Sequence, residues 1–163
     1  MKIIFASLLA LGLPAAAFAQ TTNDLSAQDR NFVITAAAAG IAEVQAGQLA
    51  AAKGDSAVQA VGNRMVADHG KANDTLNAIA ATKGVTPPTQ VTSDQAAELT
   101  QLQGLSGAAF DSAYLKDQRT AHETAIKLFE TEAHSGTDPA LKSFAAKTLP
   151  TLKMHLHMIK EAA

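Results

Sequence analysis

The sequence has no cysteine and few aromatic residues, and both absences restrict the fold. Without cysteine, no disulfide can stabilise the chain, and no lipid can attach to a cysteine thiol behind a signal peptide. Aromatic residues make up 4% of the chain, and valine and isoleucine are scattered singly instead of alternating with polar residues. Because half-buried strands need such alternation, we expect an all-α protein.

The sequence also lacks blocks of like charge. Its 13 Lys+Arg and 15 Asp+Glu are spread along the chain, which gives no basic patch for nucleic acid or an anionic membrane. A nucleophile elbow, a glycine-rich phosphate loop and a metalloprotease motif are all missing. We therefore expect no nucleic-acid partner, and a hydrolase is the least favoured class.

The first residues have the pattern of an export signal. Residues 1–19 contain one lysine, an apolar run broken by Pro14, and the small residues Ala17 and Ala19 around Phe18. A membrane-spanning helix needs about 20 apolar residues, and no later segment is judged apolar enough, so we predict no transmembrane anchor. This predicts a signal peptide over 1–19, one domain over 20–163, and a periplasmic protein for which attachment to the outer membrane remains open.

Capping residues, glycines and prolines predict five helices. With their caps included, they cover about residues 26–53, 55–83, 93–103, 108–134 and 138–161. Tight turns near Gly54 and Gly136 join the long helices into two hairpins. Residues 85–92, which contain Pro87 and Pro88, form an extended connection. The expected fold is a four-helix bundle with one long inter-hairpin connection carrying a short extra helix, an arrangement shared with ferritin-like folds.

Each long helix is predicted to place one ionisable residue on its apolar stripe. These residues are Glu43, His69, His122 and His155. Asp68 lies at the edge of the apolar stripe of the second long helix, beside His69. Near the end of the chain, His155 and His157 point about 200° apart on a helix, so only His155 faces inward.

A carboxylate in an apolar stripe needs a partner, because an unpaired buried charge costs several kcal/mol or becomes protonated. Three inward histidines are the partners available to Glu43. Two interpretations stand side by side: metal or proton chemistry in the bundle core, or a buried hydrogen-bond network that fixes the helix register.

A wider pattern of residues carries a family resemblance. It comprises Glu43-Val44 with Gly47, Met65 with Asp68-His69, Phe110-Asp111 with Tyr114, His122, Leu128-Phe129-Glu130, and Leu149-Pro150 followed by His155. Over about residues 27–160 the chain resembles the secreted bacterial proteins grouped as domain of unknown function 4142. The resemblance implies a ferritin-like four-helix bundle in the envelope of a Gram-negative bacterium, with no settled reaction.

The candidate metal ligands are Glu43, Asp68, His69, His122 and His155, with Asp68 either a ligand or a hydrogen-bond acceptor beside one. Ferritin-like di-iron sites use Glu-x-x-His pairs, but no inward histidine here has a glutamate three residues before it. A set this rich in nitrogen favours one zinc or copper ion over two iron ions.

Three methionines, Met65, Met154 and Met158, lie within one turn of these histidines. They could add soft sulfur ligands for copper, although filling the core is the favoured interpretation. The two functions that remain are a metal-binding envelope protein and a structural, interaction or stress-associated bundle without metal. A protein partner and an oligomer remain open in both.

Overall fold

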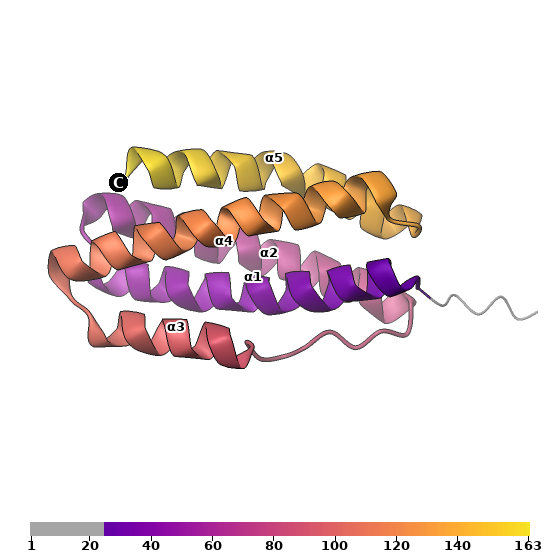
Figure 1. Ribbon diagram of the computed structural model, residues 1–163, viewed down its shortest axis with the longest axis horizontal. Coiled ribbons are helices and arrows are strands. Elements are labelled where there is room, and N and C mark those ends of the chain that lie inside the picture. The colour runs from indigo at the N-terminus through magenta and orange to yellow at the C-terminus, as the bar shows by residue number, and fades with distance from the viewer. Residues whose placement is uncertain (1–24) are drawn as a thin grey trace, which may run out of the picture.

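The computed structural model describes residues 25–163, and these form five α-helices without a strand (Figure 1). The helices are α1 (Ala27–Lys53), α2 (Ser56–Thr82), α3 (Ser93–Gly104), α4 (Gly107–Ser135) and α5 (Pro139–Glu161). The all-α class and the five helices predicted from sequence are confirmed. The predicted signal peptide, residues 1–19, lies outside the described residues.

The helix ends follow from local side-chain capping. The Asp55 carboxylate accepts hydrogen bonds from the backbone N–H groups of the first turn of α2, and the Asp138 carboxylate does the same for α5. Thr92 and Gln95 form a reciprocal capping box at the start of α3. Gly84, at φ 66°, turns the chain after α2 in a conformation that glycine adopts without strain.

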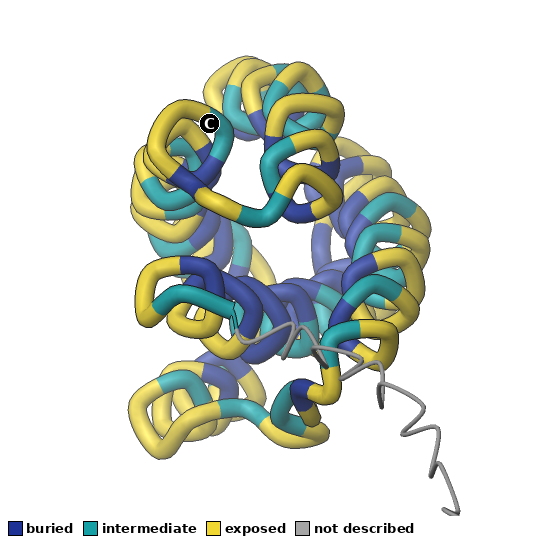
Figure 2. Tube along the Cα trace, turned by 90° about the vertical axis from the view of Figure 1, so that its right-hand side faces the viewer, coloured by how far each residue is buried: buried dark blue, intermediate teal, exposed yellow. Residues whose placement is uncertain are grey.

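The four long helices pack as a bundle of two hairpins. α1 packs along α2, and α4 packs along α5, while contacts of α1 with α4 and of α2 with α5 hold the hairpins together. α3 lies outside the four, against α1 and α4 (Figure 1). In the end-on view of Figure 2, buried positions face the space between the helices and exposed positions face outward.

The apolar core consists of two clusters at different levels of the bundle. One is built around the aromatic rings of Phe32, Phe129 and Phe144, whose centroids lie 5.0 to 6.3 Å apart. The other contains Met65 and Tyr114. In each long helix the residues of the two clusters are separated by a stretch of sequence. That stretch carries Glu43 in α1, His69 in α2, His122 in α4 and His155 in α5. A polar layer therefore lies between two apolar layers.

A second buried polar group joins the start of α1 to the α4–α5 turn. The Asp29 carboxylate accepts hydrogen bonds from the Thr137 N–H at 2.9 Å, from the Thr137 hydroxyl, and from the Asp138 N–H at 3.2 Å. Although burial opposes ionisation, these hydrogen bonds hold the pKa of Asp29 well below its usual range. The sequence analysis assigned no partner to Asp29, so this contact was not predicted.

The apolar composition of α1 contradicts one expectation from the sequence. An 18-residue window of this helix has a mean hydropathy of 1.3, so α1 is long and apolar enough to cross a membrane by length and composition alone. The judgement that no segment after residue 19 is apolar enough is therefore wrong for α1. Half of the window is buried inside the bundle, and the core helix of a soluble protein passes the same test. The absence of a transmembrane anchor stays a prediction.

Candidate metal centre

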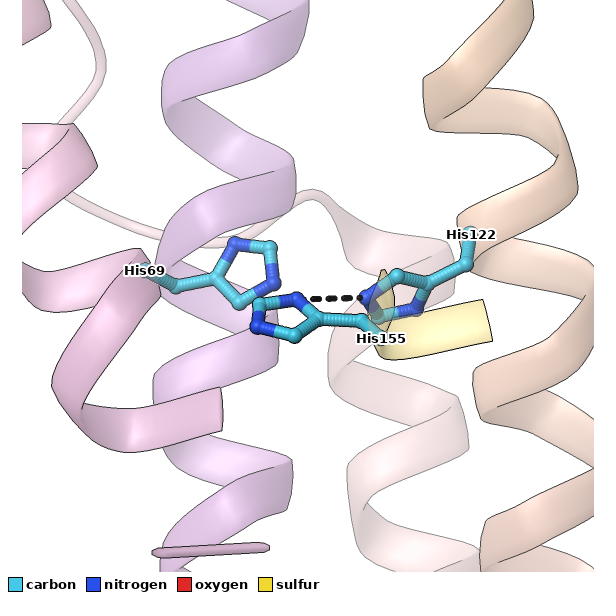
Figure 3. Close-up of side chains that lie close together, drawn as sticks. All are labelled: His69, His122 and His155. Carbon is cyan, nitrogen blue, oxygen red and sulfur yellow. Dashed lines mark hydrogen bonds between the residues drawn. The ribbon is translucent and has the colours of Figure 1, made fainter. Parts of the chain in front are cut away.

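Three histidines from three helices meet in the polar layer (Figure 3). One ring nitrogen each from His69 on α2, His122 on α4 and His155 on α5 lies within 4.8 Å of the other two. The ring centroids are 5.3 to 5.5 Å apart, and all three residues are at most 8% exposed. The sequence analysis predicted that these three side chains face inward, and their burial confirms it. His157 is exposed, also as predicted.

Hydrogen bonds at the outer nitrogens fix which ring nitrogens carry protons. His122 Nδ1 lies 3.0 Å from the Gln118 carbonyl oxygen, and His155 Nε2 lies 2.8 Å from Asp68 Oδ2. Both oxygens only accept hydrogen bonds, so both nitrogens donate. In the neutral rings, this leaves lone pairs on His122 Nε2 and His155 Nδ1, which face each other at 3.4 Å (Figure 3).

Burial keeps the three imidazoles neutral at physiological pH. It lowers the pKa of His69 to about 3, with the positive charge on neighbouring histidines adding to the effect. It lowers the pKa of His122 to about 4. Burial also lowers the pKa of His155, although its hydrogen bond to Asp68 acts in the opposite direction. The neutral imidazole is the form that binds metal, so no proton has to leave before an ion enters.

Asp68 lies behind His155 and outside the group of converging nitrogens. Its Oδ2 contacts both His155 and the Arg64 guanidinium, at 2.8 and 2.5 Å. Burial acts to raise the pKa of Asp68, but the hydrogen bonds from Arg64 and His155 outweigh it, so the carboxyl is ionised. Of the two roles considered from sequence, this position matches the hydrogen-bond acceptor of a ligand histidine and not the ligand itself.

Glu43 also lies outside the converging nitrogens, beside His122. Its Oε1 is 3.8 Å from His122 Nδ1, the nitrogen that already donates to Gln118. Burial raises the pKa of Glu43 to about 8, against a hydrogen bond from the Gln118 side chain that lowers it. The carboxyl is therefore predominantly protonated at neutral pH, and a neutral carboxyl is a poorer metal ligand than a carboxylate.

Two contributors to the site were not identified as such from sequence. Gln118 was not among the candidate residues, yet its carbonyl orients His122 and its side chain bonds Glu43. The spacing of four residues between Gln118 and His122 was the available signal. Tyr114, also fully buried, lies near enough to Glu43 for a negative charge there to raise its pKa further, in addition to burial.

The donors present fit a single borderline ion. Three neutral imidazoles converge, and the Nε2 atom of His69 is buried without a hydrogen-bond partner among the described residues. No carboxylate belongs to this converging group, so the arrangement does not match a di-iron carboxylate site. Met65 is fully buried in the apolar cluster with Tyr114, consistent with core filling. Three histidines with one open position can hold zinc or copper.

Comparison with known proteins places the chain in a family. The model of the family described as "Domain of unknown function (DUF4142)" matches residues 14–162, so the protein belongs to this family. Its fold is similar to that of a DUF305 fragment from Deinococcus radiodurans, solved by crystallography, with a TM-score of 0.74. That match has 12% sequence identity and covers 85% of this chain and 96% of the other, so it concerns the fold alone. No curated protein matches the chain.

Proposed function

We propose that this protein binds one transition metal ion, zinc or copper, through His69, His122 and His155. The observation that carries the proposal is the pair of lone-pair nitrogens, His122 Nε2 and His155 Nδ1, facing each other at 3.4 Å. Two acceptors cannot hydrogen-bond to each other, and their proximity in a buried site is unfavourable. A cation bound by both nitrogens and by His69 would satisfy them.

The surrounding groups would hold the ligand rings in place. Asp68 and the Gln118 carbonyl each accept the N–H of one ligand imidazole, and such outer contacts fix both the ring orientation and the tautomer. Glu43 would contribute a neutral carboxyl beside His122, able to release its proton next to the ion and to take it back. Three protein ligands leave a tetrahedral ion one position for water or a small ligand.

The wider setting of this function is also a proposal. The order of two hairpins and a long connection with a short helix supports a ferritin-like four-helix bundle. The pattern of residues 1–19 supports export to the periplasm of a bacterium, with association with the outer membrane as the alternative. The periplasm exposes proteins to zinc and copper without the cytosolic thiol pool, which suits a histidine site.

A second function is favoured by one specific observation. Asp68, His155, His122 and Gln118 form a continuous row of polar contacts across α2, α5 and α4. Such a buried network can fix which residues of neighbouring helices face each other, without any ion. The protein would then be a structural, interaction or stress-associated bundle.

Calorimetric titration with zinc and with copper(II) separates the two functions. We expect one ion per chain for the metal-free wild type and a loss of at least a hundredfold in affinity for His69→Ala. The exposed His157→Ala is the matched control and should keep the wild-type affinity. Equal, weak binding by all three proteins would reject the metal site and favour the structural role.

A further inference from the structure

A groove of about 660 Å³ lies between α2 and α5, on the side of the bundle away from α3 (Figure 1). The two helices come from different hairpins, and residues of both line the groove. Because α3 packs against α1 and α4, it leaves this groove uncovered. The volume lies in the range of ordinary small-molecule sites, about 300 to 1,000 Å³, so the groove can hold a small organic molecule.

The polar residues of the groove follow the helical repeat on both sides. They recur every three or four positions and are Arg64, Asp68, Lys71 and Thr75 on α2, and Ser143, Lys147 and Thr151 on α5. Residues at this spacing share one face of a helix, so each helix presents one row to the groove. The two rows consist of cations and hydroxyl groups, with a single carboxylate among them.

The charges in the groove do not balance. Asp68, its one carboxylate, already contacts the Arg64 guanidinium at 2.5 Å and His155 Nε2 at 2.8 Å. Lys71 and Lys147 are exposed, and neither forms an ion pair with another described residue. Two positive charges are therefore available to a ligand, and a groove lined by one sign of charge attracts ions of the opposite sign.

The two free lysines lie near the same level of the bundle. α2 and α5 run in opposite directions (Figure 1), and the hydrogen bond between Asp68 and His155 aligns them. Lys71 is three residues past Asp68, about 4.5 Å along the axis, and Lys147 is eight residues before His155, about 12 Å in the same direction. The difference of about 7 to 8 Å can be spanned by two lysines, because each has a flexible four-carbon stem.

The donors in the groove match phosphate better than a carboxylate. Arginine provides the planar fork that suits a carboxylate, but Arg64 is engaged by Asp68. Lysine binds phosphate as a point charge, and two lysines match a phosphate monoester, whose charge near pH 7 is about −1.5 to −2. Ser143 and Thr151, one turn on either side of Lys147, donate no hydrogen bond to a described residue and can supply further donors.

The part of the groove nearest the start of α5 is apolar. Ile79 and Ala140 line that end, and Phe144, which is 7% exposed, lies at the bottom of the groove. No charged residue lines the groove beyond Lys71 and Lys147 in this direction. An apolar group attached to a phosphate held by the two lysines could cover these side chains and remove their surface from water.

We propose that the groove between α2 and α5 binds an organic phosphate monoester, with the phosphate between Lys71 and Lys147 and an apolar substituent over Phe144 and Ile79. The site shares Asp68 with the proposed metal centre, because this carboxylate lines the groove and holds His155. Binding of the ester needs no ion, so the inference is independent of the proposed metal function.

Four probes test the ligand class on the metal-free full chain, by NMR titration of backbone amides at low ionic strength and about pH 8, where a phosphate monoester is a dianion. Phenyl phosphate should bind and shift amide signals of α2 and α5 around the groove. Phenyl sulfate has one negative charge, inorganic phosphate has no apolar group and benzyl alcohol has no charge, so each should bind at least about fivefold more weakly. No binding of phenyl phosphate would overturn the proposal, and so would equal affinity for any of the other three.

Three variants with the same change in charge locate the site. Lys71→Gln and Lys147→Gln should each weaken phenyl phosphate about fivefold or more, because each removes one contact to the phosphate. Lys160→Gln, exposed on α5 outside the groove, is the matched control and should bind as the wild type does. All three positions are exposed, so folding should not change. Equal weakening in the three variants would reduce the effect to net charge and overturn the assignment.

Two further arms separate the sources of the phosphate and the role of the ion. Sedimentation with phosphatidylcholine vesicles containing phosphatidic acid, lost in Lys147→Gln, would identify a lipid head group as the monoester; phenyl phosphate binding without sedimentation would identify a soluble ester. Binding of phenyl phosphate that requires zinc and survives Lys147→Gln would overturn the groove and support the metal centre. Binding to the metal-free protein combined with no zinc uptake would support the groove while the metal function fails.

Discussion

Asp68 Oδ2 lies 2.8 Å from His155 Nε2 and accepts its hydrogen bond, although the two residues are 87 positions apart in the chain. This contact links α2 to α5 and directs the other nitrogen of His155 toward His122 and His69. A carboxylate behind a histidine also raises the basicity of the ring as a ligand. The carboxylate therefore acts on the candidate site without entering it.

Replacing Asp68 should weaken metal binding without abolishing it. For Asp68→Ala we expect a 10- to 100-fold loss in zinc affinity, because His155 loses the acceptor that fixes its tautomer. Calorimetric titration of the metal-free protein measures this. Asp74→Ala, on an exposed position of the same helix, serves as the control and should bind as the wild type does. A complete loss of binding in Asp68→Ala would instead identify Asp68 as a ligand.

The buried histidines should make the metal-free protein sensitive to acid. The pKa values of His69 and His122 in the folded state, about 3 and about 4, lie below the unfolded value of 6.5. The unfolded chain therefore takes up protons first as the pH falls, and the folded state loses stability between about pH 6.5 and pH 4. Each such group contributes a slope of at most about 1.4 kcal/mol per pH unit.

Urea unfolding at pH 7 and pH 5 in the presence of a chelator tests this expectation. The wild type should lose more unfolding free energy between the two pH values than His122→Gln, which has no titrating ring there. Equal losses in the two proteins would show that His122 is not buried in its neutral form.

Glu132 should impose the opposite pH dependence at the far end of the bundle. It is 1% exposed, and burial together with the nearby Asp29 carboxylate raises its pKa to about 7. Because the unfolded chain releases this proton near pH 4.5, the folded state loses stability as the pH rises from about 4.5 to 7.

The Glu132→Gln variant keeps the shape of the side chain and removes its titration. It should be more stable than the wild type at pH 8, by about 1 to 2 kcal/mol, and should gain less or nothing at pH 5. Thermal or urea unfolding at both pH values measures the difference. Exposed Glu130→Gln is the control. A gain that is the same at pH 5 and pH 8 would contradict a buried titrating Glu132.

Helix bounds could be predicted from the sequence because they depend on local chemistry. The helix ends are defined by residues that act within one turn of them, namely Asp55, Asp138 and Gly84. Their effect can therefore be predicted without knowledge of the tertiary structure. The buried face of each long helix could be predicted for the same reason, because it depends only on the period of the helix. Assigning His155 to the core and His157 to the surface needed no neighbouring helix.

The relative heights of the site residues were harder to predict. Counting residues from Gly136 predicts that His122 and His155 differ in height along the bundle axis by roughly 7 Å. Counting from the observed ends of α4 and α5 reduces this difference in height to roughly 4 to 5 Å. The residues of the turn do not add helical rise, so the first count was too large. Side chains span the smaller offset, which is why the rings meet.

The roles of Asp68, Glu43 and Asp29 depend on tertiary contacts that no local pattern contains. Asp68 and Glu43 were grouped with the histidines, but in the packed bundle both carboxyl groups lie outside the converging nitrogens. Asp29 meets Thr137, 108 residues away. Only the packing of α1 against the α4–α5 turn determines that partner.

Metal content tests the proposed site most directly. The protein would be purified without a histidine tag, and zinc, copper and iron would be measured by mass spectrometry in the wild type, His69→Ala and His157→Ala. We predict close to one zinc or copper ion per chain in the wild type and in His157→Ala, and a loss of that ion in His69→Ala. A wild type without metal, even after incubation with zinc or copper and dialysis, would contradict the proposal.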